Sequence, residues 1–407
     1  MLVMLFIIIR WAVIFINSFR YKEYNCQNKD FFTTVIIPVV DEPEEIFCDV
    51  VSRIVNQCPD EIIVVINGPE NPALMHACEK IRKEAENDSC KTDIKTFYTE
   101  VAGKRNAIRI GVENSSPESD VTVLVDSDTL WSPDTLEKLL MPFSADEKVG
   151  GVTTRQKIFK PNRSLATVFA SILEEVRAEG SMKAMSAGGK VGCLPGRTIA
   201  FRTSIMRCAM DEFMTEEFLG IHKEVSDDRS LTNIALKKGY KTVLQDSSVV
   251  YTDAPVTWKK FFRQQLRWAE GSQYNNLRMT PFMLKKAKLM AFIYWTDMIM
   301  PLLLISVYLS NAVIIALRIA GYGAETLPNP FGFIPTVLLI IIGSIFGFGA
   351  RNIKIMKSIP LHYILFFPVI ILILSMIMAP LRVIGLMKCA DGISWGTRDL
   401  DGNGGGQ

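Results

Sequence analysis

Two aspartates separated by one residue, Asp126 and Asp128, follow directly on the apolar run Val121–Val125. In extended chain, side chains two residues apart point the same way, so these carboxylates can share one divalent cation. Oxygen ligands of this kind suit Mg²⁺ or Mn²⁺ bridged to a diphosphate. Acidic pairs with this spacing are also common in surface loops, so neighbouring features must decide whether this one is a metal site.

A second acidic pair, Asp227 and Asp228, stands immediately before a helical pattern formed by Leu231, Ile234 and Ala235. These carboxylates could simply cap that helix, because such side chains accept hydrogen bonds from its first N–H groups. Alternatively, one of them is a general base that faces the metal site. The sequence leaves both interpretations open.

Lys104 and Arg105 follow Gly103 where a strand pattern gives way to a helical one. The N–H groups of a helix start and two adjacent cations together make an anion site. A solvated helix cap would produce the same pattern.

The segment Thr257–Trp268 has two faces of different character. One is an apolar stripe made of Trp258, Phe261, Phe262 and Leu266. On another face, Gln264, Arg267 and Trp268 fall at positions i, i+3 and i+4. This combination suits a sugar, whose C–H faces stack on indole while its hydroxyls meet polar side chains. The basic residues of the same segment could instead contact lipid headgroups.

Short β-branched runs alternate with helical patterns around these residues. The predicted strands are Thr33–Val40, Glu61–Ile66, Ile94–Tyr98 and Val121–Val125, and the predicted helices are Pro43–Asn56, Asn71–Glu86 and Lys104–Val112. The alternation predicts a mostly parallel sheet with crossover helices, which binds ligands at the carboxyl ends of its strands. Asp41, Glu42, Asn67 and Asp126 all follow or end such strands, which indicates a nucleotide pocket.

The two ends of the chain are apolar. Met1–Phe19 could just span a bilayer at about 1.5 Å per residue. It lacks a small-residue cleavage site and basic residues follow it, so we expect an uncleaved anchor whose C-terminal end lies in the cytosol. Three more apolar stretches come later, Leu289–Leu317, Phe331–Ala350 and Leu361–Leu386. Their lengths predict an integral membrane protein with a soluble central region.

Composition narrows the chemistry further. The eight cysteines have no C-x-x-C spacing and there are only three histidines, which argues against a zinc site or a histidine-based triad. Scattered reduced thiols fit a reducing cytosol. The net charge of +2 gives no indication of a nucleic-acid partner.

The acidic pairs and the Gln264–Trp268 cluster, taken in this order, resemble the processive family-2 glycosyltransferases, which include cellulose, chitin and hyaluronan synthases. Trp395–Arg398 (Trp-Gly-Thr-Arg) resembles the gating motif of hyaluronan synthases. Three stretches are similar to type 3 capsular polysaccharide synthases: Gly150–Lys157, Cys193–Thr198 and Arg263–Asn276. Ser226 stands where hyaluronan synthases tend to have glycine, which favours the capsule-synthase branch.

The resemblance implies an α/β fold in which a cytosolic, Rossmann-like glycosyltransferase A-type domain with a mostly parallel sheet is inserted between transmembrane helices. The implied division is an N-terminal transmembrane helix (1–19), the cytosolic domain with interfacial amphipathic helices (20–285), and a C-terminal transmembrane or re-entrant region with the gating motif (286–407). For the donor, the resemblance implies a uridine pocket at Asp41, Glu42 and Asn67, a diphosphate contact at Lys104 and a nucleotide contact at Asp126. For catalysis, it implies a metal ligand at Asp128 and the general base at Asp228. It further implies that Gln264, Arg267 and Trp268 contact the acceptor and the diphosphate, and that Trp395 and Arg398 gate the UDP site. Asn67 departs from the aspartate usual at its position.

The implied activity is an inverting hexosyl transfer from UDP-sugars, dependent on Mg²⁺ or Mn²⁺, in the bacterial plasma membrane. The implied partners are the UDP-sugar donors, the growing polysaccharide and membrane lipids, with no obligate protein partner. We expect a polymer of alternating glucose and glucuronic acid made from UDP-glucose and UDP-glucuronate, with hyaluronan as the alternative. A nucleotide-binding transporter or scaffold and a non-processive transferase are the competing classes.

Two expectations concern the membrane. Arg10 lies midway along the first apolar segment, where an unpaired cation is costly; it could snorkel to the surface or face the path of the polymer. Basic residues flank Leu361–Leu386 on both sides and two prolines interrupt it. We therefore predict that this stretch enters and returns, or lies along the interface, which keeps Trp395–Arg398 in the cytosol.

The apolar stripe of Ser164–Met182 is typical of a core helix or of one in the headgroup plane.

Overall fold

The computed structural model describes residues 2–86, 91–320 and 373–390. These residues form two compact units. The sheet unit contains the described parts of 23–159 and 189–253, with residue 390. The helical unit contains those of 2–22, 160–188 and 254–389.

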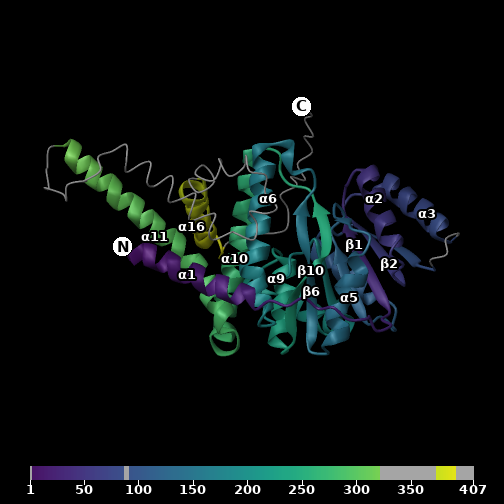
Figure 1. Cartoon of the computed structure of the whole chain (residues 1–407). Helices are drawn as coiled ribbons and strands as arrows, with labels where there is room; N and C mark the ends of the chain where they lie inside the picture. The colour runs from purple at the N-terminus through teal and green to yellow at the C-terminus, as the bar shows by residue number, and fades with distance from the viewer. Residues whose placement is uncertain (1, 87–90, 321–372, 391–407) are drawn as a thin grey trace. The chain divides into compact units, whose positions relative to one another are not determined.

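The first half of the sheet is parallel. Its strands are β1 (Thr33–Val39), β2 (Glu61–Asn67), β3 (Asp93–Thr99) and β4 (Val121–Val125), arranged in the order β3-β2-β1-β4 (Figure 1). Between them the chain forms α2 (Glu44–Val55), α3 (Pro72–Glu86) and α4 (Lys104–Glu113). The predicted alternation of strands and crossover helices is confirmed here.

The second half of the sheet is mixed. Strand β7 (Thr198–Arg202) runs antiparallel to both β4 and β6 (Val149–Ile158), β10 (Lys241–Thr252) runs parallel to β6, and β5 (Leu130–Trp131) is antiparallel to β10. The sheet is parallel-rich, as expected, and β7 and β5 are its antiparallel exceptions. The chain between β6 and β7 passes through the helical unit rather than through a crossover helix, so the usual parallel βαβ connection does not set the direction of β7.

The remaining elements of the sheet unit are α5 (Thr135–Ala145), α8 (Thr203–Met214), α9 (Asp227–Lys237) and a small hairpin of β8 (Glu217–Phe218) and β9 (Ile221–His222). The hairpin and the start of α9 follow α8 closely in the chain, and both bear on the functional site described below.

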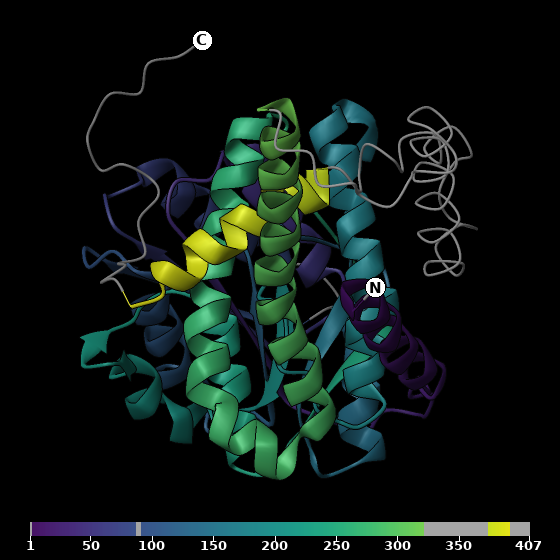
Figure 2. The same ribbon diagram turned by 90° about the vertical axis from the view of Figure 1, so that its left-hand side faces the viewer.

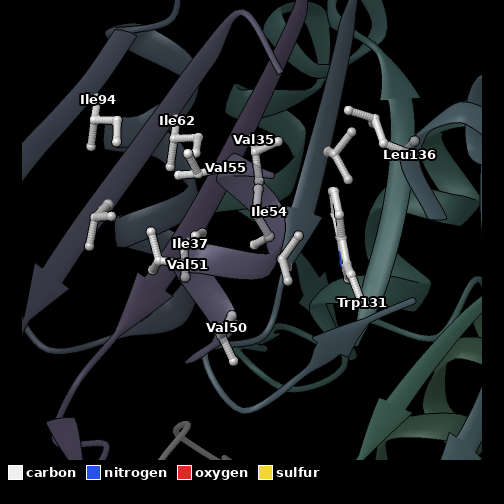
Figure 3. Close-up of a cluster of buried hydrophobic side chains, with 14 of the residues drawn as sticks. Val35, Ile37, Val50, Val51, Ile54, Val55, Ile62, Ile94, Trp131 and Leu136 are labelled. Atoms are coloured by element: carbon white, nitrogen blue, oxygen red, sulfur yellow. The ribbon is translucent and has the colours of Figure 1, made fainter. Parts of the chain in front are cut away.

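Every residue of β1 and β2 is buried, so both faces of these strands are covered by other parts of the protein. On one face Val35, Ile37 and Ile62 pack against α2, which contributes Val50 and Ile54 (Figure 3). The alternation of side chains along a strand sends the intervening residues to the opposite face. The apolar runs that predicted buried strands are therefore the core of this unit.

On the opposite face, α4 packs closely against β1. A Cβ atom on Gly111 would lie 2.5 Å from Cγ2 of Ile36, so only glycine allows the helix to approach this far. Arg105 and Ile108 of the same helix are buried. This packing fixes the first turn of α4, which carries Lys104.

The helical unit is built from α1 (Leu2–Phe19), α6 (Leu165–Arg177), α7 (Lys183–Ser186), α10 (Trp258–Lys286), α11 (Lys288–Ile319) and α16 (Ala379–Met387), with a 3₁₀ turn at Pro161–Arg163 and π-helical stretches at Ala178–Met182 and Leu374–Met378. Helix α16 crosses α10 and α11 (Figure 2). Gly385 permits the contact with α10, because a Cβ there would lie 2.7 Å from Cβ of Ala269.

Helix α6 carries the apolar stripe noted in Ser164–Met182. Ser164 caps the helix by accepting a hydrogen bond from the Thr167 N–H at 3.2 Å. Phe169 packs against Trp258 and Phe261 of α10, with ring centroids 5.8 and 5.4 Å apart. The core interpretation therefore holds at Phe169, whereas the first residue of the stripe, Leu165, is exposed.

Within the described ranges, one helix is long and apolar enough to cross a membrane, Lys288–Ile314 in α11. It matches the predicted stretch Leu289–Leu317. Leu5–Phe19 and Met376–Met387 are apolar but shorter. Phe331–Ala350 lies outside the described residues, and so do residues 361–372 of the last predicted stretch.

Arg10 of α1 has a partner on α11. Its Nε donates to Oγ1 of Thr296 at 3.0 Å and its guanidinium pairs with the carboxylate of Asp297. Arg382 of α16 lies 3.8 Å from the same carboxylate. The ion pair relieves the cost of a lone cation in an apolar helix, so Arg10 need not snorkel.

The cysteines depart from expectation at one position. Cys58 is disulfide-bonded, whereas Cys26, Cys48, Cys78, Cys193, Cys208 and Cys389 are thiols. The expectation of reduced thiols throughout is therefore wrong at Cys58.

Candidate active site

The predicted nucleotide-site residues of the sheet unit gather at the carboxyl ends of its parallel strands. Asp41 and Glu42 follow β1, Asn67 ends β2, Lys104 follows β3, and Asp126 follows β4. Because these strands are neighbours in the sheet, their carboxyl ends meet at one edge. Asp41 is exposed and Glu42 is half-buried, and the Glu42 carboxylate accepts a hydrogen bond from the Val40 N–H at 3.3 Å.

Asn67 bridges three of these segments. Its Nδ2 donates to the carbonyl oxygen of Val39 at 2.9 Å, and its Oδ1 accepts from the N–H of Gly103 at 3.0 Å. Gly103 has a φ of 141°, a conformation that favours glycine. An aspartate could accept from Gly103 but could not donate to Val39. The departure from aspartate therefore has a structural use here, which the sequence did not reveal.

Lys104 pairs with the carboxylate of Asp126. Burial by itself would lower the pKa of Lys104, but the nearby carboxylates of Asp126, Asp227 and Asp228 outweigh burial and raise this pKa above its ordinary value. Lys104 therefore stays protonated, and it lies between the β4 end and the start of α9. A cation in this position can meet a diphosphate.

Asp128 shares this acidic surrounding. Its pKa is raised to about 6, first because neighbouring protein shields the carboxyl from water, and then because Asp126 and Glu42 are negative, while Arg197 and Lys104 oppose the rise. The side chain of Asp128 reaches the surface of the site, where a ligand can contact it. A crowded pair of carboxylates of this kind is stabilised by a cation.

The second acidic pair opens α9, and its two members lie in different surroundings. The Asp227 carboxylate is buried and accepts from Nε of Arg105 at 2.9 Å. Burial raises the pKa of Asp227, and Arg105 and Lys104 oppose that rise. The Asp228 carboxylate accepts from the Arg229 N–H at 2.8 Å and lies 3.5 Å from Sγ of Cys193. Asp228 is only half-buried, so it is the member that remains accessible to a substrate.

Gly196 brings Asp228 and Lys104 together. A Cβ on Gly196 would lie 3.4 Å from Cβ of Asp228 and 3.7 Å from Nζ of Lys104. The candidate base and the candidate diphosphate cation therefore line the same small space. Ser226, just before the acidic pair, has φ 64° and ψ 53°. This left-handed conformation is one that glycine adopts without strain and that other residues adopt rarely.

Arg197 is a site residue that the sequence analysis missed. Its Nη1 donates to Oε1 of Gln156 at 2.8 Å, and Nε2 of Gln156 donates to the Pro195 carbonyl at 3.1 Å. The Arg197 carbonyl accepts from the N–H of Asp126 at 3.0 Å. The available signal was the stretch Cys193–Thr198, which was noted for its resemblance but given no role.

The remaining predicted residues do not belong to the described part of the sheet unit. Gln264 and Arg267 are half-buried and Trp268 is exposed on α10, in the helical unit. Trp395 and Arg398 lie outside the described residues. The described structure thus brings together the sheet-unit part of the predicted site.

The donor set for a metal is small. Among the described residues, no group of three or more histidine, cysteine, aspartate or glutamate side chains converges to hold an ion. Asp126 and Asp128 offer hard oxygen ligands, which fit Mg²⁺ or Mn²⁺ when a diphosphate and water supply the rest of the coordination shell. The residues present therefore fit a metal that arrives with a nucleotide rather than a preformed metal centre.

Comparison with known proteins assigns the chain to a family. The sequence profile described as "Glycosyltransferase like family 2" matches residues 29–271, more than half of the chain. The chain belongs to glycosyltransferase family 2. The match spans all of the strand-end residues and both acidic pairs.

The sequence identity to individual relatives is below 30%. The chain is 29% identical over 266 residues to a hyaluronan synthase of Streptococcus pyogenes, covering 64% of this chain and 62% of the relative. It is 28% identical over 261 residues to an N-acetylglucosaminyltransferase of Rhizobium meliloti, covering 63% and 59%. The similarity thus spans about three fifths of each of these relatives.

A solved structure shows the same fold. A mannosyltransferase from Pyrobaculum calidifontis in complex with GDP-Man and Mn²⁺ superposes with a TM-score of 0.57 at 15% identity, covering 95% of this chain and 97% of that one. The shared architecture is a glycosyltransferase A-like α/β fold with a parallel-rich sheet.

Proposed function

We propose that this protein is a membrane-embedded, processive, inverting glycosyltransferase that polymerises sugars from UDP-sugars and moves the polysaccharide across the membrane. The observation that carries the proposal is the meeting of Asp228, Lys104 and Asp126 in one site of a family-2 chain. Nucleotide binding alone, as in a transporter or scaffold, needs no half-buried carboxylate beside the diphosphate cation.

In the proposed reaction, Asp228 takes the proton of an acceptor hydroxyl as the hydroxyl oxygen attacks the anomeric carbon from the face opposite UDP. The new glycosidic bond forms as the bond from the anomeric carbon to UDP breaks, and the electron pair leaves with UDP. Lys104 stabilises the charge that builds on the departing diphosphate. Mg²⁺ or Mn²⁺ held by Asp128, when bound, would add Lewis-acid stabilisation there.

Other residues keep their proposed binding roles. Asp41, Glu42 and Asn67 line the uridine pocket, and Asp126 contacts the nucleotide. Gln264, Arg267 and Trp268 hold the acceptor end and the leaving diphosphate, a role supported by the exposed indole of Trp268. Trp395 and Arg398 gate the UDP site.

We place the protein in the bacterial plasma membrane with the catalytic domain in the cytosol. The candidate span in α11 and the apolar helix α1 support membrane insertion. A charged polysaccharide cannot cross lipid unaided, so the helices provide its path. Membrane lipids, UDP-sugars and the growing polymer are the proposed partners, without nucleic acid or an obligate protein partner.

The proposed product is a type 3-like capsule of alternating glucose and glucuronic acid, because whole stretches of the chain resemble the pneumococcal type 3 capsular polysaccharide synthase. Hyaluronan is the second candidate, favoured by the similarity to the streptococcal hyaluronan synthase. A hyaluronan synthase would use UDP-N-acetylglucosamine in place of UDP-glucose.

The test is to give purified protein labelled UDP-sugars singly and in pairs, then to digest any polymer with linkage-specific hydrolases. We expect long polymer only with UDP-glucose and UDP-glucuronate together. Polymer from UDP-N-acetylglucosamine and UDP-glucuronate would select hyaluronan, short products would exclude a processive enzyme, and no UDP release with any donor would refute a transferase.

The metal assignment has its own test. Asp128→Asn should weaken both the metal dependence of turnover and the affinity for UDP in the presence of Mg²⁺. Equal UDP affinity of the wild-type protein with and without Mg²⁺ or Mn²⁺ would refute the assignment.

A further inference from the structure

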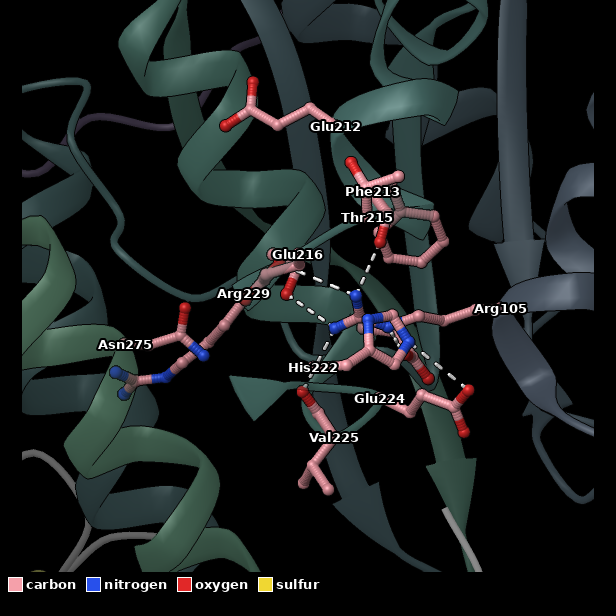
Figure 4. A network of polar contacts seen from close by, with 12 residues as sticks. Arg105, Glu212, Phe213, Thr215, Glu216, His222, Glu224, Val225, Arg229 and Asn275 are labelled. Carbon is pink, nitrogen blue, oxygen red and sulfur yellow. Dashed lines mark hydrogen bonds and ion pairs between the residues drawn. The ribbon is translucent and has the colours of Figure 1, made fainter. Parts of the chain in front are cut away.

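Two consecutive residues of α4, Lys104 and Arg105, have different surroundings. Lys104 is 20% exposed and pairs with Asp126. Arg105 is 4% exposed and points into the protein interior (Figure 4). The sequence pattern grouped Arg105 with Lys104 as an anion site, but the structure corrects this expectation, because the Arg105 guanidinium is buried and bonded to protein groups.

Arg105 ties the end of α8 to the start of α9. Its Nη1 donates to the Phe213 carbonyl at 2.6 Å, and its Nη2 donates to the Val225 carbonyl at 3.3 Å and to Oγ of Ser230 at 3.0 Å. The guanidinium also lies 4.6 Å from the centroid of the Phe213 ring. These contacts close the segment 213–225, which contains the β8–β9 hairpin, at its two ends.

Two carboxylates lie around Arg105, one on the segment 213–225 and the other at the start of α9. Nε donates to the buried Asp227, and Nη1 lies 3.7 Å from the fully buried carboxylate of Glu216 (Figure 4). Buried charges are tolerated when they are paired and hydrogen-bonded, and removing one partner leaves the other uncompensated. The planar fork of a guanidinium can serve all these acceptors at once, whereas a lysine ammonium cannot.

This arrangement fixes where Asp228 points. Successive residues of a helix project about 100° apart around its axis, so a buried, hydrogen-bonded Asp227 sets the direction of Asp228. The left-handed Ser226 immediately before them allows the sharp entry into α9. Asp228 is thereby turned toward Gly196 and Lys104.

We propose that Arg105 is a positioning residue for the transfer reaction: by holding Asp227 and the two ends of segment 213–225, it sets the general base Asp228 beside Lys104. Two adjacent residues of α4 thus have different tasks: Lys104 contacts the diphosphate and Arg105 positions the base. The inference rests on the proposed function, because it assigns Asp228 as the base. It implies that loss of Arg105 impairs the chemical step more than nucleotide binding.

The experiment compares Arg105→Lys, Arg105→Met and Asp227→Asn with the wild-type protein. Arg109→Met is the matched control, because Arg109 lies one turn later on α4, is 43% exposed and pairs with two residues of its own helix, Asn106 and Glu113. Measured quantities are kcat and KM for the UDP-sugar, UDP affinity, thermal stability, and hydrogen exchange of peptides from residues 213–230. If Arg105→Met does not fold, Asp227→Asn supplies the same test with a side chain of nearly equal shape.

We expect kcat to fall roughly 100-fold in Asp227→Asn and Arg105→Met, as for a misplaced catalytic group, with UDP affinity and KM little changed. Exchange should rise within 213–230. Arg105→Lys should restore thermal stability without restoring kcat, because it keeps the charge but not the fork. Arg109→Met should match the wild-type protein.

Three results would overturn the role of Arg105. They are unchanged exchange in 213–230, wild-type kcat in the folded variants, or a parallel loss of kcat, UDP affinity and thermal stability, which marks a purely structural residue. Absence of UDP release by the wild-type protein itself would instead refute the proposed transferase activity.

Discussion

Asp227 and Asp228 are adjacent carboxylates with different surroundings, and this difference separates a structural from a chemical task. Asp227 is buried against Arg105, whereas Asp228 stays half-buried beside Cys193 and Gly196. A general base must reach the acceptor hydroxyl, so accessibility favours Asp228. The helix-cap interpretation does not describe this pair, because the N-cap residue of α9 is Ser226 and Asp228 accepts from the N–H of its neighbour Arg229.

Asp228→Asn is expected to abolish polymer formation while UDP binding stays nearly intact. The amide has the same size but cannot take a proton, and the nucleotide is held by other residues. Turnover and UDP affinity check this, with Asp49→Asn as the control, because Asp49 is an exposed carboxylate of α2 that pairs with its neighbour Arg53. Turnover close to that of the control would show that Asp228 is not the base.

Asn67→Asp should lower thermal stability. The change removes the donor to the Val39 carbonyl and places a carboxylate beside it, and a buried polar group left unpaired costs about 1–3 kcal/mol. Asn114→Asp is the control, because Asn114 makes a similar side-chain bond to a carbonyl, at Ile110, but is exposed. Equal melting temperatures for the two variants would contradict the bridging role of Asn67.

At the scale of elements, the packing of α3 against the sheet controls the chemistry of Cys78. Burial raises the pKa of this thiol to about 11, a hydrogen bond with Thr96 opposes the rise, and Cys48 adds to it. The ordinary pKa of this thiol is 9.0, so the folded protein keeps its proton in a range where the unfolded chain loses it. Stability contributed by Cys78 is therefore complete below pH 9 and is lost as the pH rises toward 11.

Cys78→Ala should accordingly flatten the fall in melting temperature between pH 8.5 and pH 10.5, whatever constant loss the smaller side chain causes. Cys208→Ala is the control, because Cys208 is exposed on α8. Identical pH slopes for Cys78→Ala and the wild-type protein would show that the thiol does not ionise differently on unfolding.

At the scale of the whole molecule, the pair of Arg10 and Asp297 joins helices that are 287 residues apart in the chain. Arg10→Leu should lower thermal stability in detergent, because it leaves the Asp297 carboxylate with only the more distant Arg382. Arg10→Leu combined with Asp297→Leu should recover part of that loss. Arg20→Leu, at the exposed position that follows α1, is the control, and a double variant no better than the single one would argue against the pair.

The topology of the C-terminal region gives the second molecular-scale prediction. If Leu361–Leu386 enters and returns, the C-terminus lies in the cytosol, where Trp395–Arg398 could gate the UDP site. A single cysteine at Gly404, in a variant stripped of native cysteines, should then resist membrane-impermeant thiol reagents in intact cells and react after lysis. Labelling without lysis would place the C-terminus outside, and the gating role would fall with it.

The sequence by itself determined the local elements and the chemical character of the strand ends. The buried runs of β1, β2 and β4, the more exposed strand β3 and the helices between them were predictable, because side-chain period is written in neighbouring residues. The placement of Asp41, Asn67, Lys104 and Asp126 at one edge followed from the rule that parallel strands share a carboxyl end. The oxygen ligands and the family motifs followed from residue type and spacing alone.

Only the tertiary structure decided how distant residues pair. Arg105 and Asp227 are 122 positions apart, and no local pattern links them. The amide of Asn67 finds Val39 and Gly103, and β7 lies antiparallel between β4 and β6, only because the sheet takes one particular strand order. Such contacts depend on which segments become neighbours in space, and that choice is made by packing across the whole chain rather than by any short stretch of it.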